Sequence, residues 1–96
     1  MANNIPDRVM RDIIKAASAH GIERVILFGS RARGTNSQRS DIDIAVSGGD
    51  CGAFADDIKE NAHTLLTFDV VELDKGVSKE LLAEIERDGV TIYEKA

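Results

Sequence analysis

The chain has 96 residues, 43% of them hydrophobic and 30% charged, a balance typical of one folded domain rather than a disordered segment. Its net charge of −5 argues against a general nucleic-acid binder, which needs a broad basic face. No apolar run reaches the roughly 18 residues of a membrane span, and the single cysteine, Cys51, excludes an internal disulfide.

Two further expectations follow from the composition. The opening residues, Met1-Ala2-Asn3-Asn4, lack the basic and apolar segments of a secretory signal, which together with the lone cysteine favours a reducing cytoplasm. One cysteine and the separated His20 and His63 do not make a ligand cluster, so a zinc site is not expected.

The first predicted helix runs from about Pro6 to His20, because proline is tolerated in a first helical turn and Gly21 follows. Its apolar stripe recurs at helical spacing and comprises Val9, Met10, Ile13, Ile14 and Ala17. The next segment, Arg24 to Phe28, is short and rich in β-branched residues, which predicts a buried strand.

A loop or short helical turn follows from Gly29 to about Gly34, and 35–40 is a polar loop. The remaining predicted elements, in chain order, are a strand over Ile42–Val46, a helix over Gly52–Ala62 capped by Asp50, a strand over Phe68–Leu73, a helix capped by Ser78 with Leu81, Leu82 and Ile85 inward, and an edge strand over Thr91–Tyr93. This order predicts an α/β or α+β fold, in which helices cover a small mixed sheet in a single domain over 1–96.

The Gly29-Ser30 step ends a predicted strand and opens a turn. Backbone N–H groups converge at such a turn, glycine lets the backbone approach a ligand closely, and a serine hydroxyl can donate to a phosphate oxygen. The segment has neither the spacing of a Walker loop nor that of a dinucleotide fingerprint. It is therefore a candidate phosphate cradle of another kind.

Asp41 and Asp43 are spaced i, i+2, which on a strand puts both carboxylates on one face, with Ile42 and Ile44 on the other. Two such acids repel each other, and hard divalent cations prefer carboxylate oxygen. The alternative is that one aspartate caps the turn and the other is merely exposed. The Gly-Ser step upstream favours metal binding.

A third acid is needed to complete such a site, and Asp69 is the first candidate because it interrupts an apolar run that reads as a buried strand. An unpaired acid there is costly, so a partner such as a metal is expected. Glu72 and Asp74 are competitors nearer the strand end, where exposure is the default.

The loop between these motifs carries Arg31, Arg33 and Arg39 and no acid, in an otherwise acidic chain. Such a trio is commonly a solvated basic loop. Its place between the Gly-Ser step and the aspartates favours contact with an anion.

Gly29-Ser30, Asp41-x-Asp43 and a later strand Asp69 together resemble the minimal nucleotidyltransferases of the DNA polymerase β-like superfamily. The resemblance covers most of the chain, including Leu27 to Gly34 and the closing 84–94 segment. It implies that a nucleoside triphosphate, ATP or another, is the substrate and that two Mg²⁺ ions are bound by Asp41, Asp43 and Asp69. It also implies that Gly29 and Ser30 hold the triphosphate. From their place beside this step, Arg31, Arg39 and Ser40 are further predicted nucleotide-binding residues, and Arg31, Arg33 and Arg39 are predicted to contact the leaving diphosphate.

Small members of this family commonly act as antitoxins beside HEPN-domain toxins, and the resemblance implies transfer of AMP to a tyrosine of such a partner. Two alternatives remain open. The chain could be a binding module that neutralises its partner sterically, or a transferase acting on a small hydroxylated compound such as an aminoglycoside. The absence of a recognisable acceptor domain counts against transfer to a small compound. A domain this small is expected to leave its nucleotide cleft open, which suggests association with a partner or a second copy.

Overall fold

The computed structural model describes residues 5–96, so Met1-Ala2-Asn3-Asn4, on which the expectation of no secretory signal rests, lie outside the described residues. The elements, in chain order, are α1 (Asp7–Ala19), β1 (Arg24–Phe28), α2 (Gly29–Arg33), β2 (Ile42–Ser47), α3 (Cys51–Asn61), β3 (Phe68–Glu72), the 3-10 turn η1 (Leu73–Lys75), α4 (Lys79–Asp88) and β4 (Val90–Glu94). Within residues 5–96, every helix is too short or too polar to cross a bilayer.

The four strands form one mixed sheet in the order β3-β2-β1-β4. β1 is antiparallel to both of its neighbours, β2 and β4, whereas β2 and β3 run parallel. The parallel pair is joined by α3, as a crossover connection requires. The predicted small mixed sheet flanked by helices is confirmed, and β4 is an edge strand as expected.

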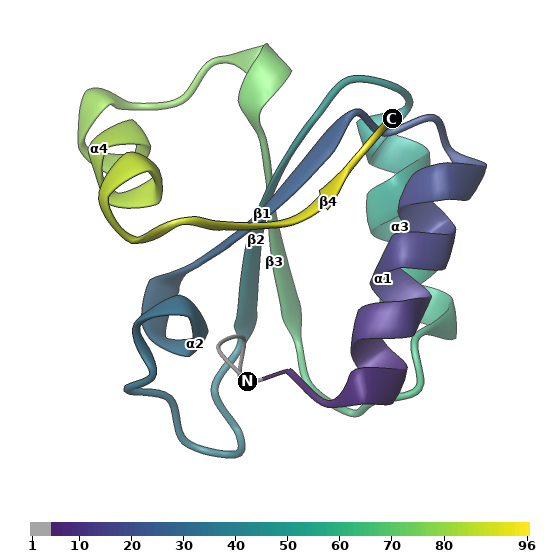
Figure 1. Ribbon diagram of the computed structural model, residues 1–96, viewed down its shortest axis with the longest axis horizontal. Helices are drawn as coiled ribbons and strands as arrows, with labels where there is room; N and C mark the ends of the chain where they lie inside the picture. Colours follow the sequence, from purple (N-terminus) through teal and green to yellow (C-terminus); the bar gives the residue numbers. More distant parts are fainter. Residues whose placement is uncertain (1–4) are drawn as a thin grey trace.

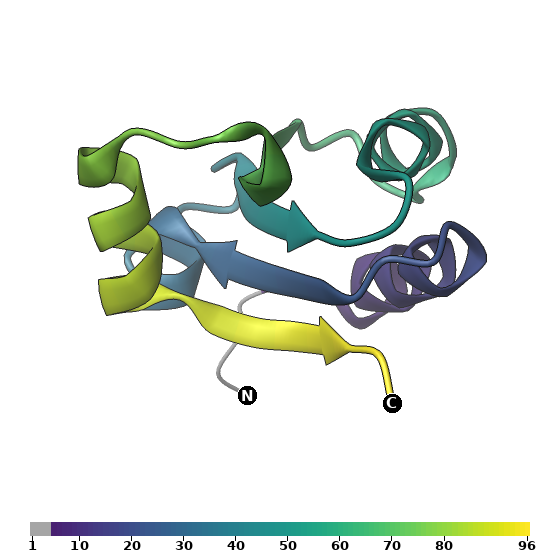
Figure 2. The same cartoon turned by 90° about the horizontal axis from the view of Figure 1, so that it is seen from above.

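Helices cover the sheet unequally on its two faces (Figures 1 and 2). α1 and α3 lie together against one face, and α4 lies against the other. In the larger core, α1 and α3 pack against alternate residues of the strands, including Ile42, Ile44 and Phe68. The smaller core, around Phe28, Ala45 and Ile85, lies under α4. The α4 face is therefore the less completely covered one, and the candidate site lies there.

Both predicted helix caps are present. The Asp50 carboxylate accepts from the Ala53 N–H at 3.0 Å, and the Ser78 hydroxyl accepts from the Leu81 N–H at 3.2 Å. These bonds satisfy N–H groups that have no partner within the first helical turn.

Three predicted placements need correction. Leu82 was expected inward but is 40% exposed, because the core-facing stripe of α4 narrows to Leu81 and Ile85. Ile14 is 37% exposed, at the margin of the α1 stripe. The third strand ends at Glu72, and Leu73 begins a 3-10 turn that reverses the chain toward α4.

Candidate functional site

Gly29 begins α2 at the end of β1 and has a φ of +73°, a conformation that other residues rarely adopt. Its Cα faces Asp43 so closely that a Cβ there would collide with the Asp43 carboxylate. The antiparallel register explains this approach, since Phe28 pairs with Asp43 and Gly29 comes next. The glycine of the Gly-Ser step therefore lies directly against one of the predicted metal ligands.

Asp43 and Asp69 are register partners on the parallel strands β2 and β3. Because parallel partners point to the same face, both carboxylates lie on the face covered by α4, opposite Ile42 and Ile44. Asp41 directly precedes β2 rather than lying within it, and is exposed. The three predicted aspartates thus share the end of the sheet where β2 and β3 begin and where β1 leads into α2 at Gly29. Figure 1 shows these three strands and α2.

The electrostatic setting of Asp43 confirms that negative charge gathers at this end. Partial burial raises the pKa of Asp43, and the nearby charges of Asp69, Asp41 and Glu84 raise it further, whereas Arg33 opposes the shift. Like charges disfavour the ionised form of each other unless a cation neutralises them. A divalent cation would relieve this repulsion.

The donor set suits Mg²⁺, because all three candidates supply carboxylate oxygens. Within residues 5–96, however, no three acidic, histidine or cysteine side chains already form a metal-binding cluster. Asp69 is exposed, not buried as its apolar neighbours suggested, because β3 is an edge strand that α4 leaves uncovered at this point. Its exposure removes the argument that burial demands a partner, and its role as a ligand rests on its register with Asp43.

Arg31 is the buried charged residue of the described chain, with 3% of its surface exposed. Its guanidinium donates from Nε to the Ser40 carbonyl at 3.0 Å and from Nη2 to the Gln38 carbonyl at 3.2 Å. These bonds tie α2 to the backbone that leads into Asp41. The burial favours a positioning role for Arg31 over the predicted contact with phosphate.

The other predicted nucleotide-binding residues lie in α2 and in the 34–41 loop that follows it. Ser30 is half-buried in α2, and its carbonyl accepts from the Thr35 N–H at 3.0 Å. The Ser40 hydroxyl accepts from the Ser37 N–H at 2.9 Å, which closes the loop on itself. Arg39 is exposed on the side of the loop that faces the segment before β3. Their contacts with nucleotide stay predictions.

Two acids of α4 belong to the surroundings of the site and were not predicted from the sequence. Arg33 forms ion pairs with Asp88 at 3.3 Å and with Glu84 at 4.0 Å, linking α2 to α4. The spacing of Glu84 and Asp88, one helical turn apart, would have shown that they share a helix face. It could not have shown that this face meets Arg33. Contact of Arg33 with a diphosphate stays a prediction.

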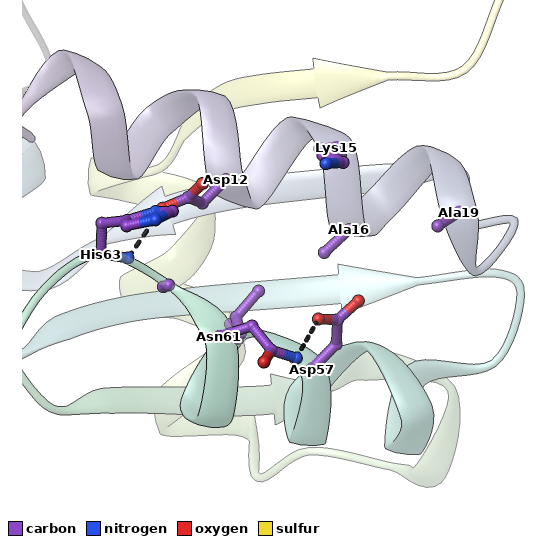
Figure 3. Close-up of a pocket in the computed structure, with 9 residues that line it drawn as sticks. Asp12, Lys15, Ala16, Ala19, Asp57, Asn61 and His63 are labelled. Carbon is purple, nitrogen blue, oxygen red and sulfur yellow. Dashed lines mark hydrogen bonds and ion pairs between the residues drawn. The ribbon is translucent and has the colours of Figure 1, made fainter.

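A separate crevice lies between α1 and α3, on the opposite face of the sheet (Figure 3). The side chains of both histidines meet aspartates of the neighbouring helix, His63 Nδ1 with Asp12 and His20 Nε2 with Asp57, each at 2.9 Å. The hydrogen bond of His63 lowers the pKa of Asp12. These pairs link the two helices. The crevice has no part in the aspartate site.

Replacing Arg31 should separate its two possible roles. Arg31→Met leaves the Ser40 and Gln38 carbonyls without these donors, so we expect the free energy of unfolding to fall by about 1–3 kcal/mol. Cleavage by trypsin after the exposed Arg39 should become faster as the loop loosens. Urea unfolding and timed proteolysis check this, and Arg31→Lys should recover only part of the loss. Unchanged stability with weaker nucleotide binding would indicate a phosphate contact instead.

Comparison with known proteins places the chain in a family. The family model described as Polymerase beta, Nucleotidyltransferase matches residues 11–96. Comparison with curated proteins gave no match. Because the family match spans most of the chain, this protein belongs to the polymerase beta nucleotidyltransferase family.

Three solved structures show the same fold. A toxin–antitoxin crystallised with AMP-PNP is 26% identical with a TM-score of 0.71, over 90% of this chain and 73% of that one. A mutant of the MntA–HpeT toxin–antitoxin is 27% identical with a TM-score of 0.67, over 88% and 72%. A protein described as a minimal nucleotidyltransferase is also 27% identical, with a TM-score of 0.63 over 84% and 86%.

Proposed function

We propose that this protein transfers AMP from ATP to a hydroxyl of a partner protein, a tyrosine of a HEPN-domain toxin, and thereby acts as its antitoxin. The observation that carries the proposal is the Gly29 backbone lying against the Asp43 carboxylate, which in turn is paired in register with Asp69. Membership of the nucleotidyltransferase family supports the reaction. The likeness to a toxin–antitoxin crystallised with AMP-PNP supports both the nucleotide and the kind of partner.

In this proposal, Gly29 and Ser30 hold the triphosphate, while Asp41, Asp43 and Asp69 hold two Mg²⁺ ions. When bound, these ions would neutralise the charge that develops on the attacking and leaving oxygens. The acceptor oxygen forms a bond to the α-phosphorus as the bond to the β-phosphate oxygen breaks, and pyrophosphate leaves. Asp69 takes the proton of the acceptor hydroxyl, because it is the exposed member of the register pair.

Direct transfer assays test this function. Purified protein with Mg²⁺ and α-labelled ATP should label a purified HEPN-domain toxin, and peptide mapping should find AMP on a tyrosine. Label should be absent when Mg²⁺ is chelated. Neutralisation of the toxin in cells without any label would support the steric alternative. Label on an aminoglycoside but on no protein would support small-molecule transfer.

A further inference from the structure

The in-line geometry of nucleotidyl transfer gives the site a direction, on the basis of the function proposed above. The attacking and leaving oxygens lie on opposite sides of the phosphorus. If the triphosphate is held by Gly29 and Ser30 after β1, pyrophosphate leaves on the β1 side. The acceptor hydroxyl then arrives from the opposite side, past Asp69 on the edge strand β3.

The surface on that side combines an exposed apolar side chain with a cation. Leu65, in the segment that joins α3 to β3, has a relative exposure of 105%, the highest among the exposed large hydrophobic residues of the described chain. It lines a shallow pocket of about 600 Å³ together with Arg39, Thr64, Leu66 and Thr67. The segment is anchored beside the aspartates, because the Thr67 carbonyl accepts from the Ile42 N–H at 2.9 Å.

The two sides of this pocket come from different parts of the chain. The 34–41 loop supplies Arg39, and the connection before β3 supplies 64–67, at the end of the sheet where β2 and β3 begin (Figure 1). Leu66 packs against the core and so holds the connection in place, while Leu65 points away from it. The exposed Leu65 and the exposed Arg39 therefore line one pocket at the end of the sheet that carries the three aspartates.

The charge of the pocket indicates what would cover it. In the part of the chain that the structure describes, the Arg39 guanidinium forms no ion pair, although the chain carries 17 acidic residues. The Arg39 guanidinium can therefore pair with a carboxylate on a partner protein. Charged groups at the edge of an interface steer the association of the two proteins. Leu65 complements an apolar side chain.

We propose that Arg39 and Leu65 form the docking surface for the acceptor protein. The occupant is a protein segment that carries the acceptor hydroxyl, an apolar side chain for Leu65 and a carboxylate for Arg39. This assigns Arg39 to the acceptor rather than to the nucleotide.

The first test measures affinity for a purified HEPN-domain toxin by calorimetry without nucleotide. Leu65→Asp should weaken binding at least about tenfold, and Arg39→Gln should weaken it and flatten its dependence on salt. Ile14→Asp is the matched control, because it makes the same charge change at a partly exposed apolar position on the opposite face. Thermal melts verify that each variant is folded.

The second test separates this proposal from the proposed function. Leu65→Asp should bind Mg²⁺–ATP as the wild type does, while the KM for the toxin rises at least tenfold and kcat at saturation is retained. Loss of toxin binding in Leu65→Asp without any labelling by the wild type would sink the transferase function and keep the docking surface. Equal toxin affinity in Leu65→Asp and the wild type, or no toxin binding by the wild type, would overturn the docking surface.

Discussion

Asp43→Asn should abolish nucleotidyl transfer and at the same time stabilise the folded protein. The substitution keeps the size of the side chain but removes the carboxylate that lies between Gly29 and Asp69. Removing a residue that hydrogen-bonds to a metal ligand already lowers activity by about 10- to 100-fold. Removing the proposed ligand itself should therefore lower the transfer rate by more than about 100-fold. Labelling of the toxin under saturating Mg²⁺–ATP measures this effect.

The gain in stability has its origin in the crowded charges. Burial and the neighbouring carboxylates raise the folded-state pKa of Asp43, so the folded protein binds this proton more tightly than the unfolded chain. The contribution of Asp43 to stability is therefore present in acid and lost as the pH rises through its folded pKa. In EDTA at neutral pH, Asp43→Asn should melt a few degrees above the wild type, and the difference should narrow in acid.

Two controls make this result specific. Asp56→Asn removes one negative charge from an exposed position on α3, on the opposite face of the sheet from the site, and should change neither the melting temperature nor the transfer rate appreciably. Mg²⁺ should raise the melting temperature of the wild type, since a ligand stabilises the state that binds it, and should do so much less for Asp43→Asn. A variant that melts below the wild type in EDTA would contradict the charge-crowding account.

The sequence predicted the fold well because its elements are short and clearly punctuated. Gly21 follows α1, Asp50 and Ser78 cap the next two long helices, and these signals act within a few residues of the chain. The prediction that Leu82 is buried was wrong. The apolar spacing of a helix shows which residues share a face, but not how much of that face the sheet covers.

The sequence indicated the residues of the candidate site but not their surroundings. Asp43 and Asp69 stand out as acids in apolar runs, and their pairing follows once two parallel strands are adjacent. The burial of Arg31 and the contacts of Arg33 with α4 depend on how a loop and a distant helix meet in space. No local pattern carries that information, which is why all three arginines of the loop looked alike in the sequence.

Gly29→Ala should disable the enzyme through sterics alone, without removing any functional group. The variant keeps every carboxylate, hydroxyl and guanidinium, yet its new Cβ would collide with the Asp43 carboxylate at a backbone φ of +73°. We expect the free energy of unfolding to fall by about 1–3 kcal/mol from backbone strain and displacement. Transfer should fall about 100-fold, because displacing a catalytic group by about 1 Å can cost that much.

Gly21→Ala separates the two causes of that loss. Gly21 has nearly the same φ, +68°, but a Cβ there would meet nothing within 4 Å, so the variant carries the backbone strain without the collision. It should lose stability and keep its transfer rate. In an Asp43→Ala background, the collision at Gly29 is largely removed, and Gly29→Ala should then cost no more stability than Gly21→Ala. If both glycine variants lose transfer equally, contact with Asp43 is not the reason for glycine at position 29. If only Gly29→Ala loses transfer, the glycine is needed at position 29 because it leaves room for the Asp43 carboxylate.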